Sequence, residues 1–190
     1  MRMYRMLLVS FLVIGTTVQV SAQKSKDAKK YKIKAAKITS TITRDGKEVT
    51  VVELDERYDS EGNIIEEVDF DSEGAFKSKI TRTFNKAGDP TEEAYYTSDG
   101  KLKKRHVMKY NAAGDKVEEQ RFDANNVLQE KSVYTYNAKG ERTAEIVLDG
   151  KNNTVEKSLM IYDSKGMRIE RKTFDAKGTL MKKKKYQYEY

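Results

Sequence analysis

From residue 58 onward, short segments rich in Val, Ile, Thr, Tyr and Phe alternate with polar stretches that end in glycine. The apolar-rich segments are about eight or about ten residues long, a length and composition typical of β-strands. The glycines fall at positions 62, 74, 88, 100, 114, 140, 166 and 178, so their spacing alternates between 12 and 14 residues and the full repeat is 26 residues. Such a period predicts a stack of similar two-strand units.

Seven of these polar stretches have the same order: an aromatic residue, Asp or Asn, two variable residues and Gly, as in Tyr58-Asp59-Ser60-Glu61-Gly62. Asp or Asn first and Gly fourth are the residues of a type I turn whose last position has positive φ, the usual three-residue hairpin connection. Asn126 and Asn152 occupy the two places where the glycine is missing, and Asn also tolerates positive φ. The pattern therefore predicts a run of ten hairpin turns.

This turn geometry also predicts which residues face one another. Pairs are expected at Phe70–Phe76, Tyr96–Leu102, Phe122–Leu128, Leu148–Thr154 and Phe174–Leu180, and all but Leu148–Thr154 are apolar on both sides. Aromatic–basic pairs are expected at Tyr110–Lys116, Tyr136–Arg142 and Tyr162–Arg168. Continuing the same register predicts cross-strand ion pairs at Glu67–Lys79, Glu93–Arg105, Glu119–Lys131 and Glu145–Lys157.

The two faces of these strands both mix apolar and charged residues, whereas an ordinary antiparallel sheet has one clearly apolar side. We therefore expect an all-β protein: an open, twisted, largely single-layer antiparallel β-meander of about 10–12 strands built from 26-residue two-strand repeats. A sandwich or a barrel-like curl is the alternative. Residues 38–190 form the expected repeat domain, opened by a degenerate hairpin that turns at Asp45-Gly46, and residues 23–37 are expected to be a flexible basic arm.

The first residues suggest export. Arg2 and Arg5 precede a short apolar run, and Val20-Ser21-Ala22 supplies the small residues of a cleavage site, so residues 1–22 are predicted to be a signal peptide. A membrane-spanning helix is the alternative, but the apolar run is too short for it. The chain has no cysteine, which excludes a disulfide framework and a lipid-bearing thiol. We expect a periplasmic or secreted protein that is not a lipoprotein and has no later membrane span.

The elements Tyr58-Asp59-Ser60-Glu61-Gly62-Asn63-Ile64, Tyr134-Thr135-Tyr136-Asn137-Ala138-Lys139-Gly140 and Tyr162-Asp163-Ser164-Lys165-Gly166 resemble the tyrosine–aspartate (YD, or RHS) repeats of bacterial surface and secreted proteins. The resemblance covers roughly residues 58–190. It implies a β-hairpin repeat that in large members spirals into a shell around a toxin or binds cell-surface carbohydrate.

Catalytic chemistry finds little support. The only histidine, His106, takes a repeat position that Ile80, Ser132, Ser158 and Lys184 fill elsewhere, so we interpret it as a half-exposed sheet residue. Asp69 to Gly74 begins like a calcium loop, but Ile80 stands where the bidentate Glu belongs. We expect no enzyme activity, no cofactor and no metal site.

Two features are candidates for binding. One is a row of aromatics 26 residues apart with basic neighbours: Tyr58, Phe84, Tyr110, Tyr136, Tyr162 and Tyr188, with Lys116, Arg142 and Arg168. Aromatic rows stack on sugars, although they also simply cover hairpin ends. The other is the basic edge strand Lys182, Lys183, Lys184 and Lys185, which either prevents edge-to-edge aggregation or contacts an anionic polymer.

The net charge of +7 comes from interleaved residues of both signs, which is typical of a solvated surface, so nucleic acid is not the expected partner. The hypothesis that follows is a non-catalytic envelope or secreted protein that presents an extended β surface to a polysaccharide or a protein partner. The alternative is a structural or assembly module that self-associates or adds a strand through its edge.

Overall fold

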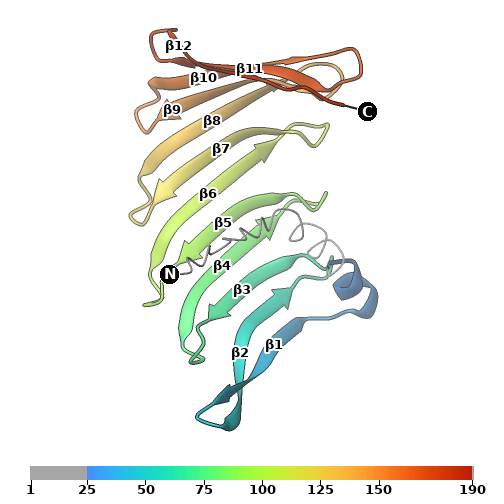
Figure 1. Ribbon diagram of the computed structural model, residues 1–190, viewed down its shortest axis with the longest axis vertical. Coiled ribbons are helices and arrows are strands. Elements are labelled where there is room, and N and C mark those ends of the chain that lie inside the picture. Colours follow the sequence, from blue (N-terminus) through green and yellow to red (C-terminus); the bar gives the residue numbers. More distant parts are fainter. Residues whose placement is uncertain (1–24, 190) are drawn as a thin grey trace, which may run out of the picture.

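The computed structural model describes residues 25–189, and within them almost every regular element is a β-strand (Figure 1). Twelve strands form one antiparallel sheet in which each strand pairs with its neighbours in the sequence, in the order β1 to β12. Extensive contacts likewise join only sequential strands. The prediction of an open, all-β meander is therefore confirmed, and the sandwich and barrel alternatives are wrong.

The strands have these bounds: β1 Ala35–Arg44, β2 Lys47–Tyr58, β3 Ile64–Phe70, β4 Phe76–Phe84, β5 Pro90–Tyr96, β6 Leu102–Tyr110, β7 Lys116–Asp123, β8 Leu128–Tyr136, β9 Arg142–Asp149, β10 Thr154–Tyr162, β11 Arg168–Asp175 and β12 Leu180–Lys185. A short helix covers residues 25–31. The predicted signal peptide, residues 1–22, lies outside the described residues.

Ten turns of one kind connect β2 to β12, and a side chain stabilises each of them. In every turn the fourth residue donates its backbone N–H to the carbonyl oxygen of the first, at 2.9–3.1 Å. In the turn that begins at Asn137, the side-chain oxygen Oδ1 accepts N–H bonds from Lys139 and Glu141, both at 3.0 Å. Asp or Asn does the same in eight other turns, and Thr97 is the exception.

The fourth turn residue has positive φ throughout, as predicted, and the two asparagines that replace glycine follow the rule. Asn126 has φ 65° and Asn152 has φ 62°. Asn is among the few non-glycine residues that adopt this region readily, because its short polar side chain bonds locally. The turn therefore keeps its geometry where the glycine is absent.

The residue pairs predicted next to the turns are confirmed. The four apolar pairs, the Leu148–Thr154 pair and all three aromatic–basic pairs form as expected. The predicted ion pairs farther from the turns are wrong by one residue, because Glu67 faces Ile80 and Glu119 faces Ser132. Three of the basic residues instead meet the preceding glutamate: Lys79–Glu66 at 3.9 Å, Arg105–Glu92 at 3.2 Å and Lys131–Glu118 at 3.2 Å.

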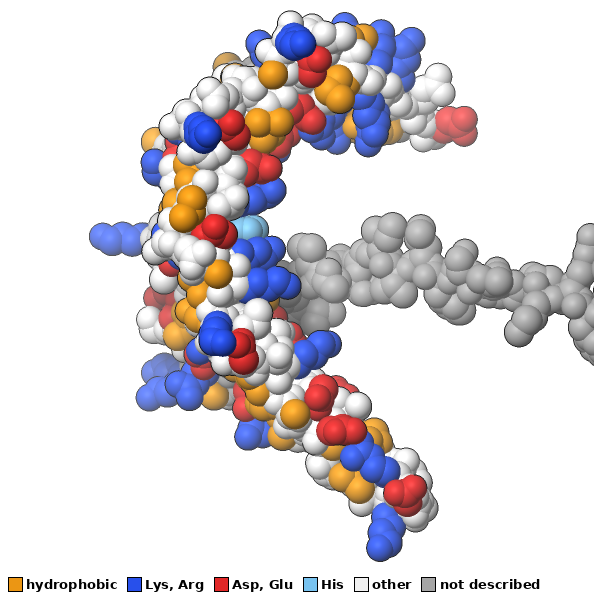
Figure 2. Space-filling view, turned by 90° about the vertical axis from the view of Figure 1, so that its left-hand side faces the viewer, with side chains coloured by type: hydrophobic (Ala, Val, Ile, Leu, Met, Phe, Trp, Pro, Cys, Tyr) orange, Lys and Arg blue, Asp and Glu red, His pale blue; other side chains and the backbone are white. Residues whose placement is uncertain are grey.

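A β-bulge that lies just after each turn causes this shift. In each strand from β3 to β12 the second residue has no partner in the preceding strand, so the register slips by one immediately after every turn. These residues are Ile65, Lys77, Thr91, Lys103, Val117, Gln129, Thr143, Val155, Ile169 and Met181. A bulge bends and twists its strand, and one in every pairing bends the whole sheet. Edge-on, the sheet is an open C with a concave and a convex face (Figure 2).

Few side chains are buried, because the sheet has a single layer. Among the described residues the buried apolar ones are Ala28, Val51, Tyr58, Ala94, Met108, Tyr134 and Met160, and the buried polar ones are Glu56, Glu119, Ser132 and Ser158. Stability must therefore come from strand pairing, turns and contacts between neighbouring side chains rather than from a common core.

The segment predicted as a flexible basic arm, residues 23–37, needs a correction. The helix of residues 25–31 packs against the turn between β2 and β3. Lys29 pairs there with Glu61 at 2.6 Å, and Ala28 is buried. The Lys34 carbonyl accepts the Tyr58 N–H at 3.0 Å, and β1 already begins at Ala35. The lysine content pointed to a solvated chain, but the lysines lie on the outer surface of a helix that docks through Ala28.

Gly62 provides a test of this docking. A methyl group at Gly62 would overlap Ser25 and Lys29 in the helix, whereas a methyl group at Gly114 would meet open space; φ is +82° and +86° respectively. Both Ala substitutions carry a backbone cost of about 1–2 kcal/mol. We expect Gly62→Ala, but not Gly114→Ala, to raise amide hydrogen exchange in residues 25–34. Equal exchange of that segment in the two variants would contradict helix docking.

Candidate binding surfaces

The concave face is defined by the pairing register. The only histidine, pale blue in Figure 2, lies on the inner side of the curve. Because alternate residues of a strand share a face and paired residues lie on the same side, the partners of His106 place a whole set of side chains there. This set includes Glu93 and Arg121, which pair with His106, and Tyr95 and Glu119.

The predicted aromatic row lies along one border of this face, and four of its members are fixed in the same way. The hydroxyls of Tyr110, Tyr136, Tyr162 and Tyr188 donate to the backbone oxygens of Pro90, Lys116, Arg142 and Arg168, at 2.7–2.8 Å. In each case the acceptor opens the preceding strand. Each tyrosine therefore ties its hairpin to the previous one, which supports the interpretation that the row covers hairpin ends. Tyr110, Tyr136 and Tyr162 are half-buried, and Tyr188 is exposed.

The other two predicted members of the row differ. The buried Tyr58 donates to Glu56 at 2.5 Å, and burial together with this bond raises the pKa of Tyr58. Phe84 has no hydroxyl and pairs with Pro90. The regular row therefore consists of the four tyrosines from Tyr110 to Tyr188, with Phe84 as an apolar extension and Tyr58 outside it.

The three basic residues predicted beside the row do not all point along it. The cations of Lys116 and Arg142 lie 5.4 Å and 4.2 Å from the ring of Tyr134, on strands that flank it. Arg168 lies 4.9 Å from the ring of Tyr186, and its Nε is buried without a hydrogen-bond partner. Tyr134, which the sequence analysis did not single out, is thus the most enclosed aromatic residue of the face, and its position two residues before Tyr136 was the available signal.

Glu119 is the centre of the charged network on the concave face. It is 8% exposed, and its carboxylate lies 2.6 Å from Lys116 and 3.0 Å from Arg121. Burial acts to raise the pKa of Glu119, but the two cations outweigh it and the pKa is lowered. Tyr134 contacts the same carboxylate at 3.5 Å and His106 at 3.8 Å.

His106 is half-buried on its strand, as predicted. Its ring centroid lies 5.2 Å from that of Tyr95, and burial lowers the pKa of His106, with Lys104 adding to the effect. An imidazole with a lowered pKa is neutral near pH 7, so the cationic groups around Glu119 are Lys116 and Arg121. Among residues 25–189 no group of His, Asp and Glu has the arrangement of a metal site.

The predicted basic edge, Lys182 to Lys185, lies in β12, the last strand of the sheet, and all six residues of β12 are exposed. Lys182 and Lys184 face the concave side, since they pair with Thr173 and Arg171. Lys183 faces the other way and contacts Glu170 at 2.9 Å. The four lysines are therefore divided between two surfaces.

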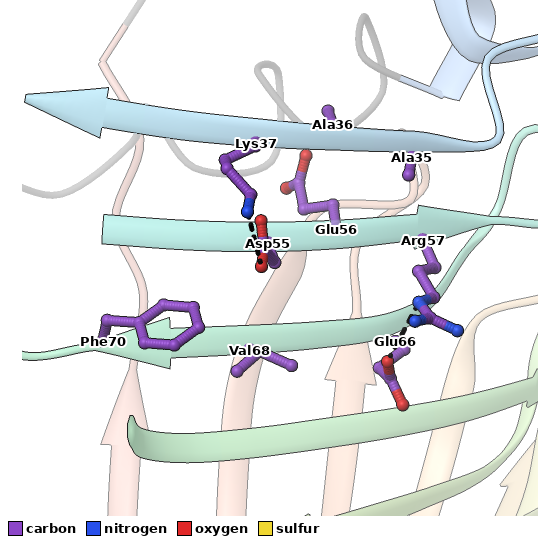
Figure 3. Close-up of a pocket in the computed structure, with 9 residues that line it drawn as sticks. All are labelled: Ala35, Ala36, Lys37, Asp55, Glu56, Arg57, Glu66, Val68 and Phe70. Carbon is purple, nitrogen blue, oxygen red and sulfur yellow. Dashed lines mark ion pairs between the residues drawn. The ribbon is translucent and has the colours of Figure 1, made fainter. Parts of the chain in front are cut away.

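A shallow pocket of about 500 Å³ lies at the other end of the sheet, between β1, β2 and β3 (Figure 3). Val68 and Phe70 form its apolar wall. Two ion pairs cross it, Lys37–Asp55 at 3.8 Å and Arg57–Glu66 at 3.4 Å. Because these charges already neutralise one another, the pocket offers no convergent group for a ligand.

The fold and its faces define a class, the open single-layer sheet of repeated β-hairpins. A chain of the Photorhabdus luminescens Tc holotoxin pore shares this fold, with a TM-score of 0.58 and 12% identity over 77% of the present chain, which spans only 8% of that toxin chain. A porin-like protein from Bacteroides uniformis matches at a TM-score of 0.43 and 12% identity, over 73% of this chain and 70% of that one, too low to establish a common fold. No family model and no curated protein matches the chain.

The toxin match agrees at the level of the fold with the resemblance to YD or RHS repeats. No helix in the described part of the chain is long and apolar enough to cross a membrane.

The bond from a tyrosine hydroxyl to the backbone of the preceding hairpin, here called the tyrosine clamp, can be tested by removing that hydroxyl. We expect Tyr136→Phe to reduce the free energy of unfolding by about 1 kcal/mol, because the bond to the Lys116 carbonyl is lost. Tyr96→Phe is the control, since Tyr96 contacts Lys79 through its ring, which the substitution keeps. Urea unfolding of the two variants measures the difference, and equal stability would show that the clamp contributes nothing.

Proposed function

We propose that the protein is an exported, non-catalytic module that binds a polysaccharide along the tyrosine-lined border of its concave face. The observation that carries the proposal is the row of Tyr110, Tyr136, Tyr162 and Tyr188, which repeats one hydroxyl contact in successive hairpins. With the hydroxyl held by the backbone, each ring has a fixed orientation and loses little conformational entropy on binding.

The spacing of the row suits a polymer. Successive tyrosines lie two strands apart, about 9.5 Å at the usual strand separation, which is close to the length of one disaccharide of an extended glycan. Apolar sugar faces stack on aromatic rings, and Arg142 and Arg168 lie beside the row as hydrogen-bond donors. A regular row therefore favours a ligand that also repeats.

The proposal of a non-catalytic role rests on the state of the titratable groups. A general acid or base needs a pKa near the working pH. The pKa of Glu119 is lowered and its carboxylate is engaged by Lys116 and Arg121. His106, the only histidine, contacts that same engaged carboxylate at 3.8 Å. Such groups suit a rigid binding face better than proton transfer.

Export is proposed from the leader-like residues 1–22. The toxin chain that shares the fold supports the reading of the repeat as a structural module, although this chain spans 8% of it. A sheet that stays an open arc presents its concave face to solvent, which suits binding better than enclosure.

The test is affinity electrophoresis of the protein against a panel of neutral and acidic bacterial polysaccharides. We expect retarded migration with at least one polymer, and a loss of affinity of at least tenfold in the triple variant Tyr110→Ala, Tyr136→Ala, Tyr162→Ala. The corresponding Phe variant keeps the rings and should retain binding within about threefold, since stacking is the main contribution.

A control removes three aromatic residues from the opposite face: Phe70→Ala, Phe122→Ala and Phe174→Ala, which alter apolar pairs beside the turns. This variant should bind like the unaltered protein, provided that circular dichroism shows it folded. Equal losses in the two Ala variants, or no retardation with any polymer, would overturn the proposal.

A further inference from the structure

The outer border of β12 is an unpaired strand edge. β12 is the last strand of the sheet, its six residues are exposed, and none of the other residues from 25 to 189 pairs with its outer side. Leu180 is 49% exposed and Met181 is 68% exposed. An uncovered edge of this kind presents free backbone donors and acceptors to another strand.

The direction of these backbone groups follows from the ladder. The Tyr186 N–H donates inward to the Ile169 carbonyl at 3.0 Å. Because successive residues of an antiparallel strand alternate in direction, the N–H groups of Lys184 and Lys182 also point inward, and those of Lys185 and Lys183 point outward. Lys183 therefore offers a backbone donor to an incoming strand without giving up a bond inside the sheet.

The positive charge of this edge is not balanced on the concave side. Lys184 lies directly opposite Arg171, and Lys182 lies opposite Thr173. Like charges that face one another across a sheet destabilise it unless an anion intervenes. Arg171, Thr173, Lys182 and Lys184, with Glu156, line a small pocket of about 220 Å³, and Arg171 is partly neutralised by Glu145 at 3.2 Å.

A second copy of the protein fits this edge poorly. Two β12 strands would bring eight lysines together. The free edge at the other end of the sheet is β1, whose charged residues, Lys37 and Arg44, are also basic. Lysine on an edge strand is a known obstacle to self-pairing, and here it repels both edges of another copy.

We propose that β12 binds an extended acidic segment of a partner protein, which adds to the sheet as a further antiparallel or parallel strand. Backbone bonds to the outward groups of Lys183 and Lys185 provide the pairing, and carboxylates at alternate positions of the segment reach Lys182 and Lys184 beside Arg171. The carboxylates of an acidic strand offset the repulsion between Lys184 and Arg171, whereas a second copy of the protein would add to it.

The experiment uses fluorescence anisotropy with a labelled ten-residue peptide that alternates Glu and Thr. The decisive pair of variants is Lys183→Pro and Lys183→Gln. Both remove the same charge and the contact with Glu170, but only Pro removes the outward N–H, at an edge position where proline is tolerated. We expect Lys183→Gln to bind within about threefold of the unaltered protein and Lys183→Pro to lose at least tenfold.

A second pair of variants tests the side chains. Lys182→Gln with Lys184→Gln should weaken binding at least tenfold, whereas Lys183→Gln with Lys185→Gln, the same charge change on the convex side, should weaken it about threefold. Sedimentation velocity should show a monomer over the concentration range of the titration. Equal binding by the Pro and Gln variants, which indicates attraction of any polyanion, or self-association in the absence of peptide, would overturn the proposal.

Discussion

The hairpin turn capped by its own first side chain is the feature on which the rest of the structure depends. In nine of the ten turns an Asp or Asn oxygen accepts two backbone N–H groups, and in all ten the fourth residue takes a positive φ, so the chain reverses in the same way each time. The next strand then begins in a fixed register. In a sheet with so few buried residues, this local geometry replaces the core that would otherwise select the pairing.

The curvature of the sheet and the make-up of its concave face both follow from the geometry just after each turn. The bulge at the second residue of each strand bends the sheet, and the bend gathers Glu119, Lys116, Arg121 and Tyr134 on the concave face. The bulges also explain three exposed apolar residues, Val155, Ile169 and Met181, which occupy the bulge positions of their strands. The tyrosine clamps then join each hairpin to the previous one, so the candidate binding row and the support of the sheet are made by the same side chains.

The turns, the strands from β3 onward, the pairs beside each turn and the open sheet could be predicted because glycine, Asp and Asn mark them in the sequence. The bulge after each turn could not be predicted, since the bulge residues, which include Ile65, Lys77 and Thr91, share no chemical property. The predicted ion pairs slipped by one residue for this reason alone. The helix of residues 25–31 was missed because the buried side chain through which it docks is only the small residue Ala28, among many lysines. The four tyrosines were found by their period, but the central position of Tyr134 and Glu119 depends on the bend.

The central claim is that each hairpin is stabilised by its own turn and its immediate neighbours. Native-state hydrogen exchange of Asn137→Ala tests it most directly, because this change removes three side-chain hydrogen bonds of the turn between β8 and β9. The account predicts faster exchange in β8, β9 and the strands next to them, β7 and β10, with protection in β3 to β5 unchanged. A uniform loss of protection across all twelve strands would contradict it, because it would show that the sheet unfolds as one unit.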